Sequence, residues 1–223
     1  MNIHTSHKIA LAGLAAIALA GIAGCAASSA SSMDADKMAM EIAQRSFRDE
    51  GIVKAEPVLA GDETLSACSA ADVAGKQLDD KTARAIEAEN LRTVQWPQGG
   101  KYLGDWREGE KIAQNGRGNT FTDTARTVNG GNCYNCHQIT KKEISFGTIG
   151  PSLYQYGKLR GVTDPSSEAS QAVVKYTWGK IWNSKAYNAC SNMPRAGHKG
   201  ILNEQQIAHV VALLLDPKSP VNE

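Results

Sequence analysis

Cys133-Tyr134-Asn135-Cys136-His137 is the stretch that decides the fold expected of this 223-residue chain. Two thiols at this spacing can each add to one of the two vinyl groups of a haem, and a histidine directly after the second thiol is carried under the iron. The motif therefore predicts one covalently bound haem c, attached through Cys133 and Cys136. His137 is the expected proximal ligand of the iron.

Two other kinds of site use a pair of cysteines at this spacing. Zinc needs a second pair of ligands, which Cys68 could provide together with Cys190 or His198. A thioredoxin-like redox centre requires a strand–helix setting, and no alternating strand pattern surrounds the motif. Haem is the interpretation that also accounts for His137.

The candidates for the second axial ligand are Met193, His198 and His209. Met193 is the only methionine after residue 95, and the following Pro194 disfavours helix at Met193. His209 falls inside the expected final helix, beside its apolar face, which suits a structural role. His198 remains the competitor, but ligand chemistry and the loop context favour Met193.

Coordination by His137 and Met193 would fill both axial positions of the iron with protein atoms. A thioether is a soft donor that favours Fe(II), so this pair raises the reduction potential above that of two histidines. With no open position for a substrate, we expect electron transfer and no catalytic residue. A catalytic haem enzyme would instead need an exchangeable axial ligand.

The N-terminus has the pattern of an export signal. Lys8 precedes an apolar run over residues 9–20 that is too short to cross a bilayer, so residues 1–24 are expected to be removed from the mature protein. The quartet that ends at Cys25 resembles a bacterial lipobox, in which the cysteine is lipidated, although ordinary cleavage beside a chance cysteine would look similar. Residues 25–32 are expected to be a tether. The predicted location is the periplasm, with a membrane anchor if Cys25 bears lipid.

Cys68 and Cys190 remain after the haem motif and Cys25 are assigned. Export to an oxidising compartment makes a disulfide between them the natural hypothesis. Two buried free thiols are the alternative.

Apolar residues at helical spacing divide the rest of the chain into two all-α units. Residues 33–95 are charged and Ala-rich, and we expect a helical extension that packs on the second unit, with Cys68 as a staple. The break at Trp96-Pro97 starts that second unit, 96–223, which would hold the haem. The helices expected there cover about 105–115, 168–182 and 203–216, the last with Asn203 as N-cap and Gln206 three residues on.

Charge gives no reason to expect a nucleic-acid partner. The formal net charge is +1, and no basic stripe is present that could follow a phosphate backbone.

Longer stretches of the second unit resemble known families. Residues 130–138 followed by 147–153 are similar to class I cytochrome c. Residues 189–202 and the tail 213–222 resemble SoxX, the monohaem subunit of the bacterial thiosulfate-oxidising (Sox) system. The most specific parts are Met193-Pro194-Arg195 and Leu214-Leu215-Asp216-Pro217.

The resemblance implies the small all-α class I cytochrome c fold, in which a helix near Gly109 crosses the final helix. It also implies haem thioethers at Cys133 and Cys136 and axial ligands His137 and Met193. The implied partners are a SoxA-like cytochrome in a heterodimer, a SoxYZ-like carrier protein and a downstream electron acceptor.

In that family the complex is an L-cysteine S-thiosulfotransferase, which joins thiosulfate to a cysteine of the carrier. The SoxX-like subunit accepts the released electrons and is not itself catalytic. Ala196 departs from the family pattern, which more often has Phe there, and the 33–95 extension is not a general feature. A free-standing electron carrier, or a haem subunit of another periplasmic dehydrogenase, is the alternative.

Overall fold

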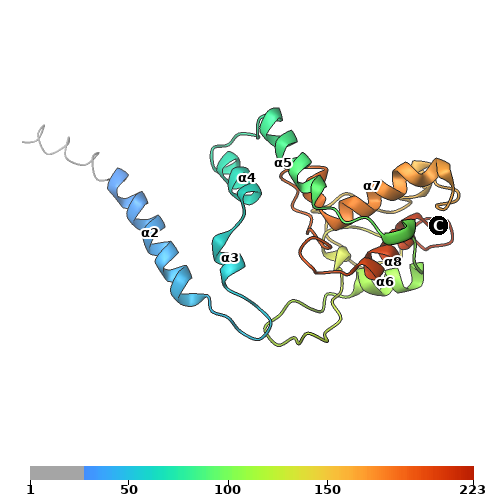
Figure 1. Ribbon diagram of the computed structural model, residues 1–223, viewed down its shortest axis with the longest axis horizontal. Coiled ribbons are helices and arrows are strands. Elements are labelled where there is room, and N and C mark those ends of the chain that lie inside the picture. Colours follow the sequence, from blue (N-terminus) through green and yellow to red (C-terminus); the bar gives the residue numbers. More distant parts are fainter. Residues whose placement is uncertain (1–27) are drawn as a thin grey trace, which may run out of the picture. The chain divides into compact units, whose positions relative to one another are not determined.

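Helices make up the regular structure of residues 28–223, the part of the chain that this computed structural model describes (Figure 1). The helices are α2 (Ser28–Ser46), α3 (Glu56–Ala60), α4 (Glu63–Val73), α5 (Asp80–Arg92), α6 (Trp106–Gln114), α7 (Gln171–Trp182) and α8 (Glu204–Leu215). Within that range the only strand-like pairing is an isolated bridge between Glu50 and Val53. The all-α expectation is therefore confirmed. The expected signal 1–24 and Cys25 lie outside the described residues.

The chain divides into two compact units at a different place from the expected boundary. The first unit is the chain up to Asp49 together with Lys54–Leu59, and the second is Glu50–Val53 together with Ala60–Glu223. Most of the expected 33–95 extension thus belongs to the same unit as the haem motif. Helix α2 already begins at Ser28, inside the segment 25–32 that we expected to be a tether.

Helices α6 and α8 cross at close range, and glycine makes this possible (Figure 1). A Cβ atom at Gly109 would lie 2.1 Å from the His209 carbonyl oxygen and 2.9 Å from Leu213 Cβ. Just before α6, the backbone N–H of Gly104 donates to the Ala208 carbonyl at 3.0 Å. The crossing implied by the family resemblance is therefore present.

The core lies mainly between α7 and α8. Its fully buried side chains include Val174, Trp178, Ile207, Val211 and Leu215. At the start of α8, Asn203 Oδ1 accepts from the Gln206 N–H at 2.8 Å, and Gln206 Oε1 accepts from the Asn203 N–H at 3.0 Å. This is the capping box that the sequence predicts.

Two separate helices, α4 and α5, lie in the second half of the helical extension expected over 33–95. Helix α4 ends at Val73, and Gly75 adopts a φ of +62°, a left-handed conformation that terminates a helix at little cost for glycine. Asp79 then caps α5 by accepting from the N–H groups of Lys81 and Thr82. The sequence predicts a helical extension here, and the structure shows where the break between its helices falls.

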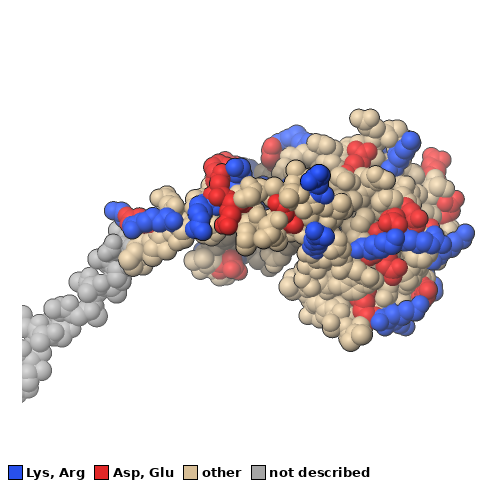
Figure 2. All heavy atoms as spheres, turned by 90° about the horizontal axis from the view of Figure 1, so that it is seen from below, with Lys and Arg blue, Asp and Glu red and all other residues tan. Residues whose placement is uncertain are grey.

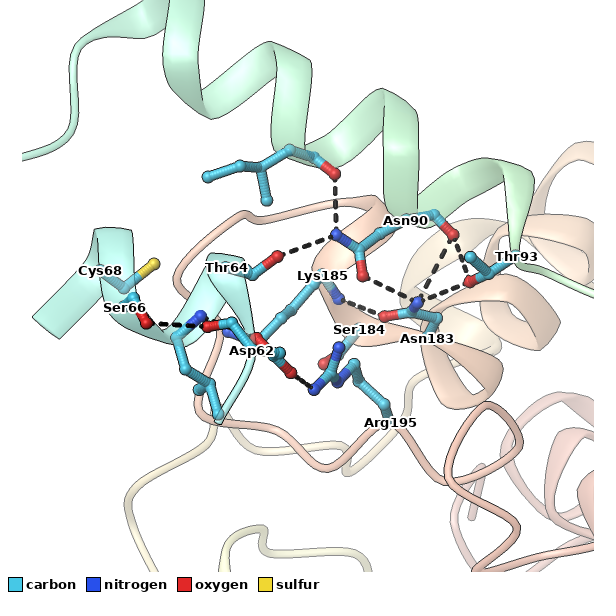
Figure 3. A network of polar contacts seen from close by, with 12 residues as sticks. Asp62, Thr64, Ser66, Cys68, Asn90, Thr93, Asn183, Ser184, Lys185 and Arg195 are labelled. Carbon is cyan, nitrogen blue, oxygen red and sulfur yellow. Dashed lines mark hydrogen bonds and ion pairs between the residues drawn. The ribbon is translucent and has the colours of Figure 1, made fainter. Parts of the chain in front are cut away.

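Buried polar side chains attach α5 to the rest of its unit (Figure 3). Asn183, just after α7, is fully buried, and its Nδ2 donates to Asn90 Oδ1 at 3.0 Å and to Thr93 Oγ1 at 2.8 Å. Its Oδ1 accepts from the Lys185 N–H at 3.2 Å. These bonds explain why the chain does not separate at residue 95.

A disulfide attaches helix α4 to the segment that follows α7. Cys68 in α4 is joined to Cys190, with a Cα–Cα distance of 5.5 Å and a sequence separation of 122. Closing so long a loop removes conformational entropy from the unfolded chain, which stabilises the folded state.

Charged side chains of both signs are interspersed on the face of the molecule seen in Figure 2. This distribution matches the near-neutral formal charge of +1. Among residues 28–223, no helix combines the length and the apolar character needed to cross a membrane.

The Asn183→Ala substitution should lower the free energy of unfolding by about 1–3 kcal/mol, because it leaves the buried acceptors on Asn90 and Thr93 without their donor. Urea unfolding of the haem-loaded protein measures this change. Asn188→Ala is the control, since Asn188 is exposed. Equal stability losses in the two variants would contradict the role given to the buried network.

Candidate functional site

The haem motif folds into a single tight turn. Residues Cys133–Asn135 form a 3₁₀ turn, and the N–H groups of Cys136 and His137 both donate to the Cys133 carbonyl, at 3.1 and 2.9 Å. Asn132 precedes the turn in the left-handed conformation, with φ +48°. Both thiols and the imidazole are thus supplied by one turn of chain.

A second segment runs alongside this turn and is held to it by backbone hydrogen bonds. Gly147 N–H donates to the Tyr134 carbonyl at 2.7 Å, and Gly150 N–H donates to the Cys136 carbonyl at 2.8 Å. Leu153 N–H donates to the Gln138 carbonyl at 2.7 Å. This pairing places Pro151 beside His137.

His137 has its ring oriented by that segment. Its Nδ1 lies 2.7 Å from the Pro151 carbonyl oxygen. A carbonyl can only accept, so Nδ1 carries the hydrogen and Nε2 keeps a free lone pair when the ring is neutral. Such a bond fixes the tautomer and ring orientation and strengthens Nε2 as a metal ligand. Nε2 is therefore the atom available to iron.

Because Gly150 has no side chain, the imidazole of His137 can pack directly against its backbone. A Cβ atom on Gly150 would lie 2.2 Å from His137 Cε1 and 2.5 Å from Nδ1. Any larger residue would push the ring away from the Pro151 carbonyl. The sequence shows a Gly-Pro turn here, but only the folded backbone shows what that glycine faces.

The environment of the motif cysteines argues against zinc and thiol redox chemistry. Burial raises the pKa of the Cys133 thiol to about 11, whereas a redox-active cysteine needs a lowered pKa. Within the described part of the chain, no three His, Cys, Asp or Glu side chains gather as a metal site would require. A thioether carries no charge, so attachment to haem suits the partly buried position of Cys133 against the core.

Met193 lies in the loop between the 3₁₀ turn Ser184–Ala186 and α8. Its side chain is partly buried and packs on the same apolar core as Cys133. Ser184 Oγ donates to the Met193 carbonyl, and the Met193 N–H donates to Ser191 Oγ at 3.2 Å. The backbone around this thioether is therefore held on both sides.

The two histidines that compete with Met193 are placed differently. His209 Nδ1 accepts from the Asp105 N–H at 2.8 Å, and its ring lies against Gly104 at the α6–α8 crossing. That is the structural role expected for it. His198 is exposed, and its backbone N–H donates to the Trp182 carbonyl at 3.0 Å.

The buried N–H of Trp182 bears on whether these residues could bind a haem. Trp182 Nε1 is the only buried side-chain nitrogen or oxygen within residues 28–223 that has no hydrogen-bond partner. The Trp178 indole, by contrast, donates to the Gln95 carbonyl at 2.9 Å. An unpaired buried N–H is costly, and a haem carries two carboxylate groups that could accept from it. The residues fit the group, and nothing in the sequence distinguishes Trp182 from Trp178 in this way.

Gly150→Ala should reduce the yield of haem-loaded protein several-fold, because the added methyl group displaces His137 from the Pro151 carbonyl. Absorbance of the haem relative to total protein measures the yield. Gly116→Ala is the control, since its Cβ would meet only the Asn132 side chain, at 3.2 Å. Normal haem content in Gly150→Ala would contradict the orientation assigned to His137.

Comparison with known proteins finds a family that part of the second unit resembles. Residues 108–217 match the cytochrome c family. The chain is also 36% identical over 142 residues to a protein of Aquifex aeolicus (strain VF5) described as an uncharacterized lipoprotein. That match covers 60% of this chain and 61% of the relative, so the chain spans about three fifths of the relative's length. The chain therefore contains an all-α cytochrome c domain, which binds c-type haem covalently and transfers electrons.

Proposed function

We propose that this protein is the electron-transfer subunit of a periplasmic thiosulfate-oxidising complex similar to SoxAX. It would accept the electrons released when thiosulfate is joined to a cysteine of a carrier protein. The observation that carries the proposal is the Met193-Pro194-Arg195 loop. This loop offers a second protein ligand to the iron and bears the most specific resemblance to SoxX.

Each site residue has one role in this proposal. Cys133 and Cys136 would form the two thioether links, and His137 Nε2 and the Met193 sulfur would hold the iron. Trp182 Nε1 would donate to a haem carboxylate. When bound, the haem supplies a one-electron Fe(III)/Fe(II) couple, and a thioether ligand favours the reduced form.

Two protein ligands on the iron leave no position for a sulfur substrate. Joining a cysteine thiolate to thiosulfate forms one S–S bond and releases two electrons, with no other product. We place that bond-forming step at the SoxA-like partner and give this subunit the transfer of the electrons, one at a time, to a downstream acceptor. The SoxYZ-like carrier would present the cysteine.

A lipid anchor at Cys25 is part of the same proposal. The Aquifex aeolicus relative is described as a lipoprotein, and the residues before Cys25 resemble a lipobox. Lipidation would hold the mature protein at the membrane on the periplasmic side, firmly only if more than one acyl chain is attached.

Met193→Ala should lower the reduction potential and open the iron to small ligands, because it removes the thioether that favours Fe(II). The far-red charge-transfer band of Met-ligated ferric haem should disappear, and carbon monoxide should bind the reduced variant rapidly. Met40→Ala is the control, since Met40 is 52% exposed on α2. A wild-type protein that lacks the band would show that Met193 is not the ligand.

The complex itself is tested by producing the chain with and without a SoxA-like cytochrome. We expect a stable heterodimer, whose haem is reduced on addition of thiosulfate and the carrier protein. Native mass spectrometry of the mature complex would report the haem and lipid content together. A persistently monomeric cytochrome that thiosulfate does not reduce would favour the alternative, a free-standing electron carrier or a subunit of another dehydrogenase.

A further inference from the structure

The loop that carries Met193 is attached to α4 at two points, one on each side of the methionine. Figure 3 shows the second of these, the pair between Asp62 and Arg195. Cys190, three residues before Met193, is bonded to Cys68. Arg195, two residues after Met193, forms an ion pair with Asp62, the N-cap residue of α4. Both ties reach across more than 120 residues of sequence.

The disulfide and the ion pair attach this loop to closely spaced points on α4. Asp62 and Cys68 are six residues apart, or about 9 Å along a helix. Arg195 is five positions after Cys190, and a fully extended chain of that length would span about 17 Å. Because both attachment points lie on one helix, they are held at a fixed distance from each other, and this limits the motion of the loop that carries Met193.

Asp62 caps helix α4 with one carboxylate oxygen and binds Arg195 with the other. Oδ1 accepts from the Leu65 N–H at 2.8 Å and caps α4, while Oδ2 pairs with Arg195. Burial raises the pKa of Asp62, but the Leu65 hydrogen bond and Arg195 lower it by more, so its pKa lies below the usual value. The carboxylate is therefore charged at neutral pH.

The ion pair between Asp62 and Arg195 is largely shielded from water, so removing one partner would leave the other charge without water to stabilise it. The Arg195 side chain is 11% exposed and the Asp62 side chain 25% exposed. A second cation, Lys185, is buried nearby and donates from Nζ to the Ala189 carbonyl at 3.1 Å. Removing the Asp62 charge would leave Arg195 without its carboxylate partner, next to another buried cation.

Helix α5 adds a tie at the start of the loop. Glu87 Oε1 accepts from the Ala189 N–H at 3.2 Å. The residues that precede the cytochrome c family match thus hold this loop at three positions, whereas Ser184 holds it from within the matched domain.

We infer that Asp62 and the Cys68–Cys190 disulfide are positioning residues for Met193, and that α4 serves as a brace that keeps the methionine sulfur on the iron. Both act through the loop and not by contact with the haem. The inference rests on the proposed ligand role of Met193 and gives a function to the N-terminal extension, which the family pattern leaves unexplained.

Asp62→Asn tests the ion pair. Asparagine is also a good N-cap, so α4 should be retained while the charge is lost. We expect carbon monoxide to bind the reduced variant several-fold faster than the wild type, because the sulfur leaves the iron more often. Asp79→Asn is the matched control, since Asp79 caps α5 and its hydrogen bonds stay within that helix. It should bind carbon monoxide at the wild-type rate.

The double variant Cys68→Ser/Cys190→Ser tests the other tie without changing any charge. We expect faster carbon monoxide binding, a weaker far-red band in the ferric protein and a lower reduction potential. In Asp62→Asn, loss of a negative charge would by itself raise the potential. A fall in potential in the double variant therefore reports the iron–sulfur bond and not electrostatics.

The outcomes separate this inference from the proposed function. A wild-type protein without the far-red band overturns the Met193 assignment and, with it, the brace. If the wild type has the band, and both Asp62→Asn and the double variant keep the wild-type band and carbon monoxide rate, the brace alone is wrong. If the double variant does not accumulate with haem, Asp62→Asn compared with Asp79→Asn decides the question.

Discussion

His137 donates its Nδ1 hydrogen to the Pro151 carbonyl at 2.7 Å, and the rest of the site depends on this bond. It leaves Nε2 as the lone pair that can bind iron and sets the plane of the ring. The carbonyl is in place because the segment 147–153 is hydrogen-bonded alongside the motif turn. Gly150 is needed because any side chain there would occupy the position of the ring.

Met193, the second iron ligand that we propose, is held by a different kind of constraint. It lies in a loop, and a loop by itself would not resist the loss of a weak iron–thioether bond. Bonds from α4 and α5 would compensate for this, through a disulfide, an ion pair and a hydrogen bond from the Ala189 N–H to the Glu87 side chain. The proximal side of the site is thus organised within one local segment, whereas the distal side depends on contacts between parts of the chain that are far apart.

This difference explains why the chain does not divide where its composition changes. The sequence predicts a boundary near residue 95, because the preceding segment is poor in large apolar residues. Buried polar bonds from Asn183 to Asn90 and Thr93 nevertheless join that segment to the haem-binding unit. Hydrophobic patterns do not reveal such bonds, since they show which residues are buried but not which polar groups are paired.

The sequence by itself determined the haem motif, the all-α class, the capped final helix and the choice of Met193, His198 and His209 as candidate ligands. These features depend on residues close together in the chain, so their spacing is sufficient evidence. Only the tertiary structure decided that Pro151 orients His137, that Trp182 has an unpaired buried donor and that α4 is tied to the Met193 loop. The first and last of these are contacts between residues 14 to more than 120 positions apart, and the second depends on which groups surround a buried indole, so no local pattern specifies them.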